Sequence, residues 1–368
     1  MTDAPAILVA GAHGAFGRAL VRDLLVNSSC RVLAAGRGRT DLSALTPGLD
    51  DSQKRRLAPA LCDLSDLRSV ASALTNAQAA VCAAGPFQEM PLHLLEVCRQ
   101  RGIPYFDLAD DRGFVRRARA LVAPAGPAAG VGWSAAPALS ALLARLACED
   151  FDSVGEIQIQ IAPGGRSPRG AATVASLCDS LAKPFTMRDG DGWRKALGWS
   201  EPRVFAFPKP VGPREGFLID VADHELLPDL FGAGRVEFRA GAQFRWMNRA
   251  TSVMAWLSRE LAFEWSALAP LLSTGLSLAG VFGSTVGAIG VEVSGFKRGA
   301  RVKRRATLVA QRGEIIPILP ASIMAPQLAA APASFQGLIP LDRWLSRAEL
   351  EQECAKRGAA LAIEETWA

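Results

Sequence analysis

The sequence is poor in the side chains on which acid–base and metal chemistry usually depend. Its 368 residues include one tyrosine, Tyr105, and three widely separated histidines, His13, His93 and His224. Three scattered histidines argue against a histidine-based metal site. The fourth residue after Tyr105 is alanine, so the Tyr-xxx-Lys proton delivery of short-chain dehydrogenases is excluded. No Ser–His–Asp order or nucleophile elbow is present, so hydrolysis has no support.

Paired cysteines and a leader segment are also missing. The seven cysteines are scattered, with no CxxC and no metal-ligand spacing. This usage predicts reduced, mostly buried thiols and a cytoplasmic protein. The first residues have no basic stretch and run directly into an apolar strand, so we expect no signal peptide. An apolar fraction of 49% over 368 residues predicts a large core and two domains.

The net charge of +5 is local. Six basic residues form a cluster with no acid inside it, and the remainder of the chain carries a charge of −1 without them. The composition therefore argues against a general nucleic-acid binder. The cluster consists of Lys297, Arg298, Arg301, Lys303, Arg304 and Arg305.

A glycine-rich turn near the N-terminus organises the first domain. Residues 6–37 predict a buried strand (7–10), an amphipathic helix (15–25) and a second strand (31–35). Gly11 permits a tight turn, Gly14 lets the backbone approach a pyrophosphate, and Gly17 lets the helix pack on the strand. The alternative is a surface turn without a ligand. The predicted cofactor-binding residues are Gly11, Ala12, His13, Gly14, Ala15, Phe16 and Gly17.

The residues after the second strand favour NADP(H). An NAD site usually carries Asp or Glu there to bind the ribose 2′-hydroxyl. This chain has Arg37 and Arg39, whose guanidinium groups suit a 2′-phosphate, although both could be solvated loop charges. Asp41 lies beyond the strand and is the one carboxylate that argues for NAD.

Later strand ends extend the predicted cofactor site. Asp63 follows a strand at 57–61 and could accept from the adenine amino group or cap the next helix. A short apolar strand at 79–83 ends in four residues that leave room for ribose and nicotinamide. These four are Ala84, Gly85, Pro86 and Phe87.

Strands and helices alternate throughout the first 150 residues. Further strands are expected at 103–107 and 128–132, and helices at 65–74, 91–100, 114–122 and 137–146. This alternation predicts an α/β fold, a Rossmann-type doubly wound parallel sheet. A mixed α+β domain for substrate and dimerisation is expected at 151–330. The segment 331–368 should pack back on the first domain through a capping-box helix at Ser346 and a strand at 360–364.

Several of these motifs carry a family resemblance. The strings GAHGAFG, AGR, AAGPF and YFDLADD resemble the NADP-binding domain of the saccharopine dehydrogenase (saccharopine reductase) family. The strings FAFPKPVGPREGFLIDVADHELLP and GEIIPILPASIMA resemble the second domain of saccharopine dehydrogenase-like oxidoreductases. The resemblance implies hydride chemistry without fixing the substrate, which in that family ranges from amino-acid conjugates and polyamine precursors to the lipid-linked alkenes of trans-acting enoyl reductases.

In the second half of the chain, alternating apolar and polar residues at 154–162 predict a strand, and residues 171–182 predict a helix. Aromatic residues are frequent between positions 185 and 265. The aromatic residues suit an apolar cleft or a dimer interface, or simply a core. Residues 266–291 carry no charge, and we weigh a buried or interfacial helix, contact with a membrane surface, and a membrane span. The competing interpretation is a basic hairpin of strands 289–296 and 301–310.

Hydride transfer needs at most one acid or base from the protein. The candidates are Asp107, which could also cap a turn, Asp110 and Asp111, which suit helix capping, and His93, which suits a structural role. The sequence thus predicts a cytoplasmic NADP(H)-dependent oxidoreductase that acts as a homodimer on a small-molecule or lipid-like substrate. Peripheral contact with a membrane is an alternative. The rivals are an enoyl-reductase-like enzyme and a non-catalytic NADP-binding protein at a membrane surface.

Overall fold

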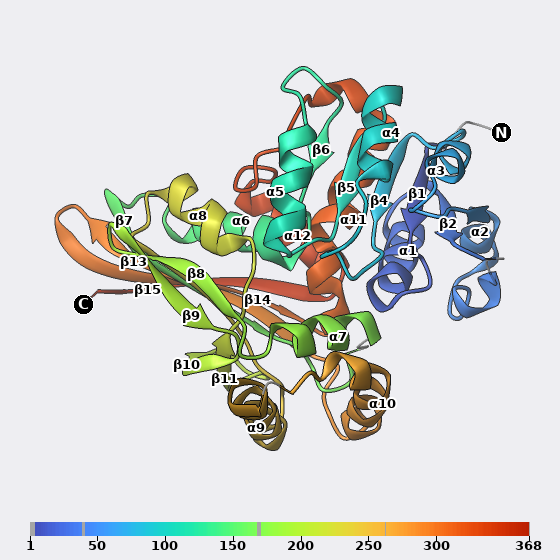
Figure 1. Ribbon diagram of the computed structural model, residues 1–368. Helices are drawn as coiled ribbons and strands as arrows, with labels where there is room; N and C mark the ends of the chain where they lie inside the picture. The colour runs from blue at the N-terminus through green and yellow to red at the C-terminus, as the bar shows by residue number, and fades with distance from the viewer. Residues whose placement is uncertain (1–3, 39–40, 168–170, 262, 368) are drawn as a thin grey trace. The chain divides into compact units, whose positions relative to one another are not determined.

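The computed structural model describes residues 4–38, 41–167, 171–261 and 263–367. The chain forms two compact units (Figure 1). The first consists of Met1–Ala135 and Pro317–Leu341, and the second of Ala136–Ile316 and Asp342–Ala368. Each unit is therefore built from two separate stretches of the chain.

The first unit contains a six-stranded parallel sheet in the order β3-β2-β1-β4-β5-β6. This is the strand order of the Rossmann fold, so the predicted fold class is confirmed. Every residue of the central strand β1 is buried, as parallel strands covered on both faces require. The strands are β1 (Ala6–Ala10), β2 (Arg31–Gly36), β3 (Leu57–Leu61), β4 (Ala79–Cys82), β5 (Tyr105–Asp107) and β6 (Ala129–Gly130).

Helices connect these strands at nearly the predicted places. The segment before β3 contains a short helix, opened by a capping box of Asp50 and Gln53. The helices of this part are α1 (Ala15–Asn27), η1 (Leu42–Ala44), α2 (Asp51–Arg55), α3 (Leu67–Ala73), α4 (His93–Arg101) and α5 (Arg112–Leu121).

A helix from the distant second stretch completes the first unit. Helix α11 (Leu319–Ala330) packs against β1, β4, β5 and α1. Among the described residues, the helical run Gly313–Ala330 is the one that is long and apolar enough to cross a membrane. Because 72% of that run is buried, its apolarity is that of a core helix.

The second unit is built on a mixed sheet in the order β10-β11-β12-β7-β13-β14-β15. Strands β7 and β12 are parallel, and the other neighbours are antiparallel. A hairpin of β8 and β9 joins this sheet through β12. The strands are β7 (Ser153–Ala162), β8 (Pro184–Asp189), β9 (Gly192–Leu197), β10 (Ser200–Ala206), β11 (Pro213–Leu218), β12 (Arg235–Ala240), β13 (Gly287–Lys297), β14 (Ala300–Ala310) and β15 (Ala359–Trp367).

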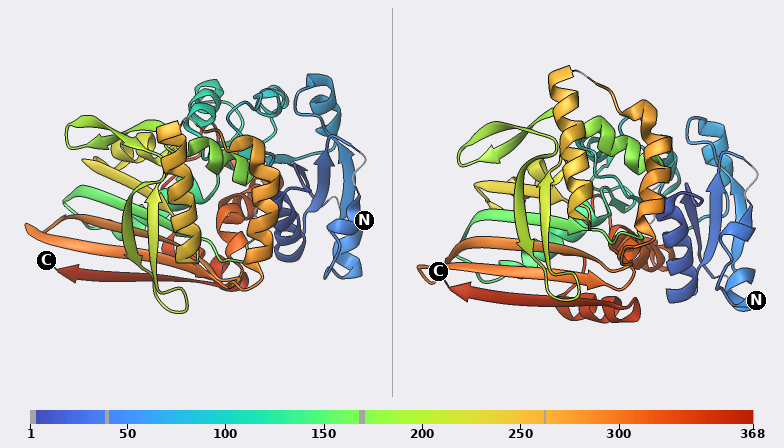
Figure 2. Two further views of the ribbon diagram at one scale, coloured as in Figure 1. Left: turned by 60° about the horizontal axis from the view of Figure 1, so that its bottom comes forward. Right: turned by 90° about the horizontal axis from the view of Figure 1, so that it is seen from below.

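Helices pack against this sheet at several places. Helix α6 (Ser140–Ala147) contacts β13 and β14, and α8 (Asp223–Phe231) contacts β12. Two longer helices, α9 (Arg245–Leu261) and α10 (Ala269–Gly280), project side by side in both views of Figure 2. Helix α7 (Ala171–Ser180), predicted at 171–182, packs against α10.

The uncharged stretch 266–291 is not one helix. It divides into η3 (Ser266–Leu268), α10 and the first residues of β13. The competing hairpin prediction is confirmed, since β13 and β14 pair in register along their whole length. Arg298 and Gly299 both have positive φ, at 51° and 76°, as the tight turn of a two-residue hairpin requires.

The prediction that residues 331–368 return to the first domain holds for 331–341, which belong to the first unit, and is corrected for the rest. The capping box of Ser346 and Glu349 does open α12 (Arg347–Lys356), and a closing strand does follow. That strand, β15, pairs with β14 in the second unit rather than packing on the first domain. Backbone pairing along β14 and the ion pair of Glu365 with Arg304 hold it there. The segment that returns to the first unit is Pro317–Leu341.

The aromatic residues divide between core and surface. Trp199 stacks on Phe217 at 4.7 Å, and Phe205 lies 4.6 Å from Phe207 over Gly290, where a Cβ atom would lie 2.4 Å from the Phe205 ring. These rings belong to the core. Trp193, Trp246 and Trp256 are instead more than half exposed.

Candidate functional site

The glycine turn after β1 has the geometry of a dinucleotide-binding turn. Gly11 has φ of +79°, and a Cβ atom there would lie 2.6 Å from the Ala84 nitrogen. A Cβ atom on Gly17 would lie 2.0 Å from the Gly11 carbonyl oxygen. Both positions therefore require glycine, one for the turn and one for close packing of α1.

The N-terminus of α1 is open. Its N-cap, Gly14, has no side-chain hydrogen bond, and the first helical bond runs from the Arg18 amide to the Gly14 carbonyl at 3.0 Å. The first-turn amides, starting with Ala15 and Phe16, therefore point out of the helix end. Gly14 itself is exposed, while Ala12 is buried and donates its amide to Ala35 at 3.2 Å. Such an end attracts anions.

His13 adds a polar group to this turn. Its Nε2 atom is buried and has no hydrogen-bond partner in the part of the chain that the structure describes. The ring lies near Asp41, whose pKa is lowered by hydrogen bonds from Ser43 and further by His13. Asp41 accepts from the Ser43 amide at 2.9 Å and from its hydroxyl at 2.8 Å. The carboxylate that argued for NAD therefore caps η1.

Arg37 and Asp63 follow the neighbouring strands β2 and β3, close enough for the charge of the arginine to act on the carboxylate. Arg37 is exposed, and its charge contributes to lowering the pKa of Asp63 after the larger effect of hydrogen bonds from Ser65. Asp63 accepts from the Ser65 amide at 2.9 Å and hydroxyl at 2.7 Å. It thus shapes the turn before α3, whose N-cap is Asp66. The other predicted arginine, Arg39, lies outside the described residues.

The end of β4 lies against the glycine turn. Ala84 is the residue that a side chain at Gly11 would strike. Gly85 and Pro86 are exposed, and a Cβ atom on Gly85 would meet nothing within 4 Å. Phe87 packs edge to face on Phe114, with ring centroids 5.0 Å apart. Small side chains therefore leave open space at this edge of the sheet.

Asp107 ends β5 and has no exposed area. Its Oδ1 atom accepts from the amides of Ala109 at 3.0 Å and Gly132 at 2.8 Å. Burial raises the pKa of the carboxyl to about 7, against the opposing effects of those two amides and of the Tyr105 hydroxyl. The geometry matches the turn-capping alternative, because Oδ1 holds two backbone amides and the carboxyl has no exposed area.

Two of the other acid–base candidates, Asp111 and His93, serve secondary structure. Asp111 is the N-cap of α5 and accepts from the Phe114 amide at 2.7 Å. Its neighbour Asp110 is exposed. His93 opens α4, and its Nδ1 lies 3.1 Å from the Leu64 carbonyl oxygen. These contacts agree with the predicted capping and structural roles.

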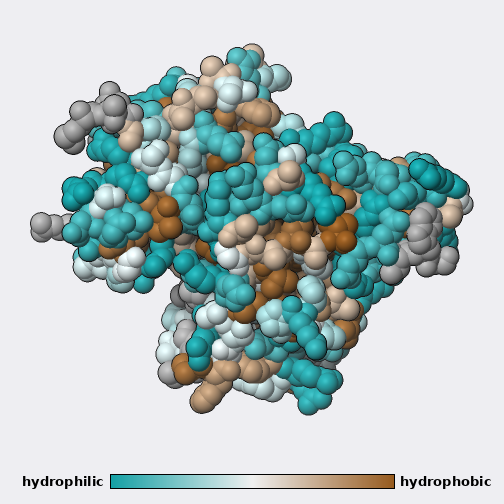
Figure 3. Space-filling view, turned by 180° about the vertical axis from the view of Figure 1, so that it is seen from behind, coloured by the Kyte–Doolittle hydropathy of each residue, from teal (hydrophilic) through white to brown (hydrophobic). Residues whose placement is uncertain are grey.

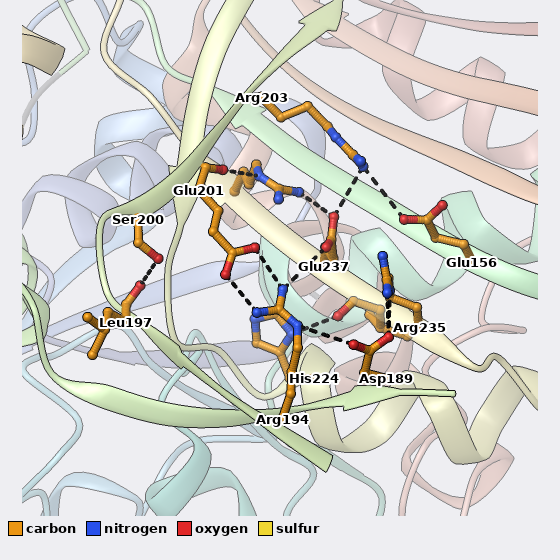
Figure 4. A network of polar contacts seen from close by, with 12 residues as sticks. Glu156, Asp189, Arg194, Leu197, Ser200, Glu201, Arg203, His224, Arg235 and Glu237 are labelled. Carbon is orange, nitrogen blue, oxygen red and sulfur yellow. Dashed lines mark hydrogen bonds and ion pairs between the residues drawn. The ribbon is translucent and has the colours of Figure 1, made fainter. Parts of the chain in front are cut away.

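The second unit contains an ion network that sequence reasoning missed (Figure 4). Glu237 is 2% exposed and binds Arg239 at 2.6 Å and Arg203 at 3.2 Å. Arg194 lies 3.6 Å from Glu237 and holds Glu201 at 2.6 and 2.8 Å. Burial alone would raise the pKa of Glu237, but the hydrogen bond and charge of Arg239, with Arg203 and Arg235, bring it below its ordinary value.

Four acids balance four arginines in this network, so it presents no net charge to a ligand. The remaining members are Asp189, Glu156 and Arg235, joined through the Asp189–Arg235 pair and the Arg203–Glu156 pair. A signal was available in the sequence: β12 reads RVEFRA, with charged and apolar residues alternating as in a strand with one polar face.

The basic cluster of the sequence is also largely paired. Lys297 and Arg304 both bind Asp150 at 2.8 Å and also contact Glu365. Two more of its members, Lys303 and Arg305, bind Glu292. The pairing acids lie elsewhere in the sequence, which is why the cluster looked unbalanced along the chain. It is not a free basic patch.

Comparisons with known proteins leave the family open. No family model and no curated protein matches the chain. A vestitone reductase from alfalfa is 20% identical, with a TM-score of 0.25, over 29% of this chain and 38% of that one. An isoflavone reductase is 19% identical, with a TM-score of 0.23, over 28% and 35%.

A further solved structure is a short-chain dehydrogenase from Burkholderia cenocepacia in complex with NADP. It is 17% identical, with a TM-score of 0.22, over 28% of this chain and 52% of that one. The chain thus spans about half or less of the length of these structures. The resemblance to the saccharopine dehydrogenase family stays a prediction.

Proposed function

We propose that this chain is an NADP(H)-dependent oxidoreductase. The observation that carries the proposal is the open N-terminus of α1 behind Gly11. Beside it lies the Nε2 atom of His13, which is buried and has no hydrogen-bond partner among the described residues. A Rossmann topology places this turn at the carboxyl edge of the sheet, where dinucleotides bind. An anionic ligand there would satisfy amide groups that the chain leaves open.

The residues present fit NADP(H) in three places. The first-turn amides of α1 would hold the pyrophosphate, and Arg37, with Arg39, would hold the 2′-phosphate. The small residues from Ala84 to Pro86 leave space for the nicotinamide half. The role of Asp41 as the cap of η1 supports NADP(H) over NAD(H), because no other carboxylate was predicted to bind the ribose 2′-hydroxyl.

When bound, the cofactor supplies or accepts the hydride. The chain's own residues bind it, orient it and leave its nicotinamide half open at β4. Because Asp107 is fully buried, we assign it a positioning role in the β5 turn instead of the catalytic role that the sequence suggested. Of the acids predicted at this strand end, Asp107 is buried and Asp111 caps α5, which leaves the exposed Asp110. An alkene substrate needs no strong acid, so this arrangement suits an alkene better than an imine.

The substrate is therefore proposed to be an activated alkene, as the enoyl-reductase-like alternative holds. The saccharopine dehydrogenase-like alternative predicts an amino-acid imine. We also propose that the protein is cytoplasmic and forms a homodimer.

Titration of the purified protein with NADPH and NADH, followed by quenching of tryptophan emission, tests the proposal. We expect NADPH to bind much more tightly than NADH. The Arg37→Ala variant should lose roughly tenfold or more of its NADPH affinity, because a charge-assisted phosphate contact is worth about 1.5–3 kcal/mol, and should keep its NADH affinity.

The matched control is Arg31→Ala, which removes an exposed arginine from the opposite end of β2. It should leave both affinities unchanged. Equal losses for the two dinucleotides in Arg37→Ala would contradict the 2′-phosphate assignment. Failure of the wild-type protein to bind either dinucleotide would refute the oxidoreductase, and binding without turnover of enoyl or imine substrates would favour the non-catalytic alternative.

A further inference from the structure

Exposed apolar side chains gather in one part of the second unit. Of the fifteen large apolar residues that are exposed among the described residues, nine lie between positions 246 and 282. A random distribution would scatter them over both units, and single exposed apolar residues need no explanation, whereas a cluster does. The nine are Trp246, Val253, Trp256, Leu261, Phe263, Leu268, Leu271, Val281 and Phe282, here called the α9–α10 surface.

Helix α9 is anchored on one side and unpartnered on the other. Its inner face buries Met247 and Asn248, and the Asn248 side chain accepts from the Ala242 amide at 2.8 Å. Ala255 packs in a cluster with Trp199 and Phe217. The outer face carries Trp246, 56% exposed, and Trp256, 51% exposed. The helix is thus amphipathic, with tryptophans on the face that the unit does not cover.

The segment after α10 presents apolar side chains from a fixed backbone. Phe282 is 87% exposed and Val281 is 57% exposed. The Arg166 guanidinium donates to the Val281 carbonyl at 2.9 and 2.7 Å. The Gln243 side chain accepts from the Ser284 amide at 2.9 Å. These bonds hold the exposed pair in place, so its exposure is a built feature of the fold.

Unpaired positive charge accompanies the apolar residues. Arg245 and Arg249 are exposed on α9 next to Trp246, and the described part of the chain gives neither an ion pair. Arg259, near the other end of the helix, binds Glu260 at 2.8 Å. The exposed Glu264 offsets one of these charges, so the surface keeps a net positive charge and its occupant should combine an apolar layer with negative charge.

We propose that the α9–α10 surface docks on an anionic membrane surface. Tryptophans and arginines on one amphipathic face are the composition of helices that lie in the headgroup region. Helix α9 carries charges along its length, so it would lie in the plane of the interface and not cross it. This inference does not depend on the proposed function, since α9 and α10 belong to the second unit.

Vesicle co-sedimentation of the full chain tests the docking. The probes are phosphatidylcholine vesicles with and without about a third phosphatidylglycerol. We expect binding to the anionic vesicles and much weaker binding to the neutral ones. The double variant Trp246→Ser/Trp256→Ser should lose roughly tenfold or more of the partition coefficient, because it removes the two largest apolar side chains of this surface, whose amphipathic rings suit the interface.

Two matched controls separate docking from general effects. Trp193→Ser removes a tryptophan that is 54% exposed on β9 and should leave partitioning unchanged. Arg245→Gln/Arg249→Gln should lose roughly tenfold on anionic vesicles alone, whereas Arg298→Gln/Arg301→Gln, an exposed pair at the β13–β14 turn, should lose little. Circular dichroism checks that each variant is folded.

Three results would overturn the proposal. The first is failure of the wild-type chain to bind anionic vesicles. The second is equal loss in Trp193→Ser and the α9 variants. The third is a dimer in analytical ultracentrifugation that Trp246→Ser/Trp256→Ser dissociates, without any vesicle binding, which would assign the surface to a second copy. NADPH titration of the same variants separates failure of the docking proposal from failure of the proposed function, since their NADPH affinity should be unchanged.

Discussion

At the carboxyl end of β5, the Asp107 carboxyl group is closed off from solvent, and one of its oxygens holds the amides of Ala109 and Gly132. The sequence placed this residue correctly at a strand end and offered both catalysis and turn capping. It could not choose, because burial depends on what the segment around Gly132 brings over the strand. Gly11 and Gly17 were different, since their roles follow from local backbone geometry alone.

The buried carboxyl makes stability depend on pH. In the folded protein the pKa of Asp107 is about 7, against an ordinary value of 3.8. The folded state therefore binds a proton at Asp107 more tightly than the unfolded state does. The contribution of this group to the free energy of unfolding is fully present below about pH 4 and is lost as pH rises through 7. The loss amounts to up to about 4 kcal/mol. Asp107→Asn keeps an amide oxygen for the two backbone amides. Its free energy of unfolding should vary less between pH 5 and 8 than that of wild type.

Urea unfolding followed by circular dichroism at several pH values measures this difference. The matched control is Asp111→Asn, which removes a carboxylate four residues along the chain while keeping a good helix N-cap. It should follow the wild-type pH profile. Parallel profiles for wild type and Asp107→Asn would show that the carboxyl is not the source of the pH dependence.

For the helices and strands, local sequence patterns located most elements but did not predict contacts between residues that are distant along the chain. The alternation of strand β7 and the turn between β13 and β14 are local signals, and both predictions hold. The ion network on β12 joins residues from five strands, so spacing along the chain did not predict it. The exposed face of α9 was missed for another reason, because core and surface tryptophans look alike in sequence.

The network predicts a large cost when its buried acid is neutralised. Glu237→Gln would leave Arg239, whose side chain is 5% exposed, without a charged partner. Breaking a buried pair on one side costs about 3–5 kcal/mol, which should appear as a lower urea midpoint for the second unit. Glu201→Gln is the control, because the Glu201 side chain is 45% exposed and such a pair is worth about 1 kcal/mol or less.

The pH dependence provides a second measurement. The folded-state pKa of Glu237 lies below its ordinary value of 4.5. The ionised carboxylate therefore contributes to the free energy of unfolding above pH 4.5, and this contribution is lost as pH falls through the folded-state pKa. Glu237→Gln should lack this loss in acid. A variant that keeps both the wild-type midpoint and the wild-type acid profile would contradict the role given to the network.

At the scale of the molecule, the two units exchange stretches of chain. The sequence predicted a boundary near residue 150 and a C-terminal return beginning at 331. The first unit instead takes Pro317–Leu341, whose Gly337 accepts from the Ala129 amide at 2.8 Å beside β6. The apolar pattern of α11 did not reveal this, because a helix buried on most sides has no polar face to orient it.

This exchange predicts how fragments behave. A fragment of residues 1–150 lacks α11 and exposes the sheet face that it covers. Four of its buried side chains, Leu319, Ile323, Met324 and Leu328, would each contribute about 1.5–3 kcal/mol, which is comparable to the whole stability of a domain. We expect that fragment to lack cooperative unfolding and dinucleotide binding.

Residues 1–135 joined by a flexible linker to 317–341 should fold and bind NADPH within roughly tenfold of the full chain, because every strand and helix of the unit is then present. Circular dichroism melting and the NADPH titration compare the two, and cooperative melting of the 1–150 fragment with full affinity would show that α11 is dispensable to the first unit.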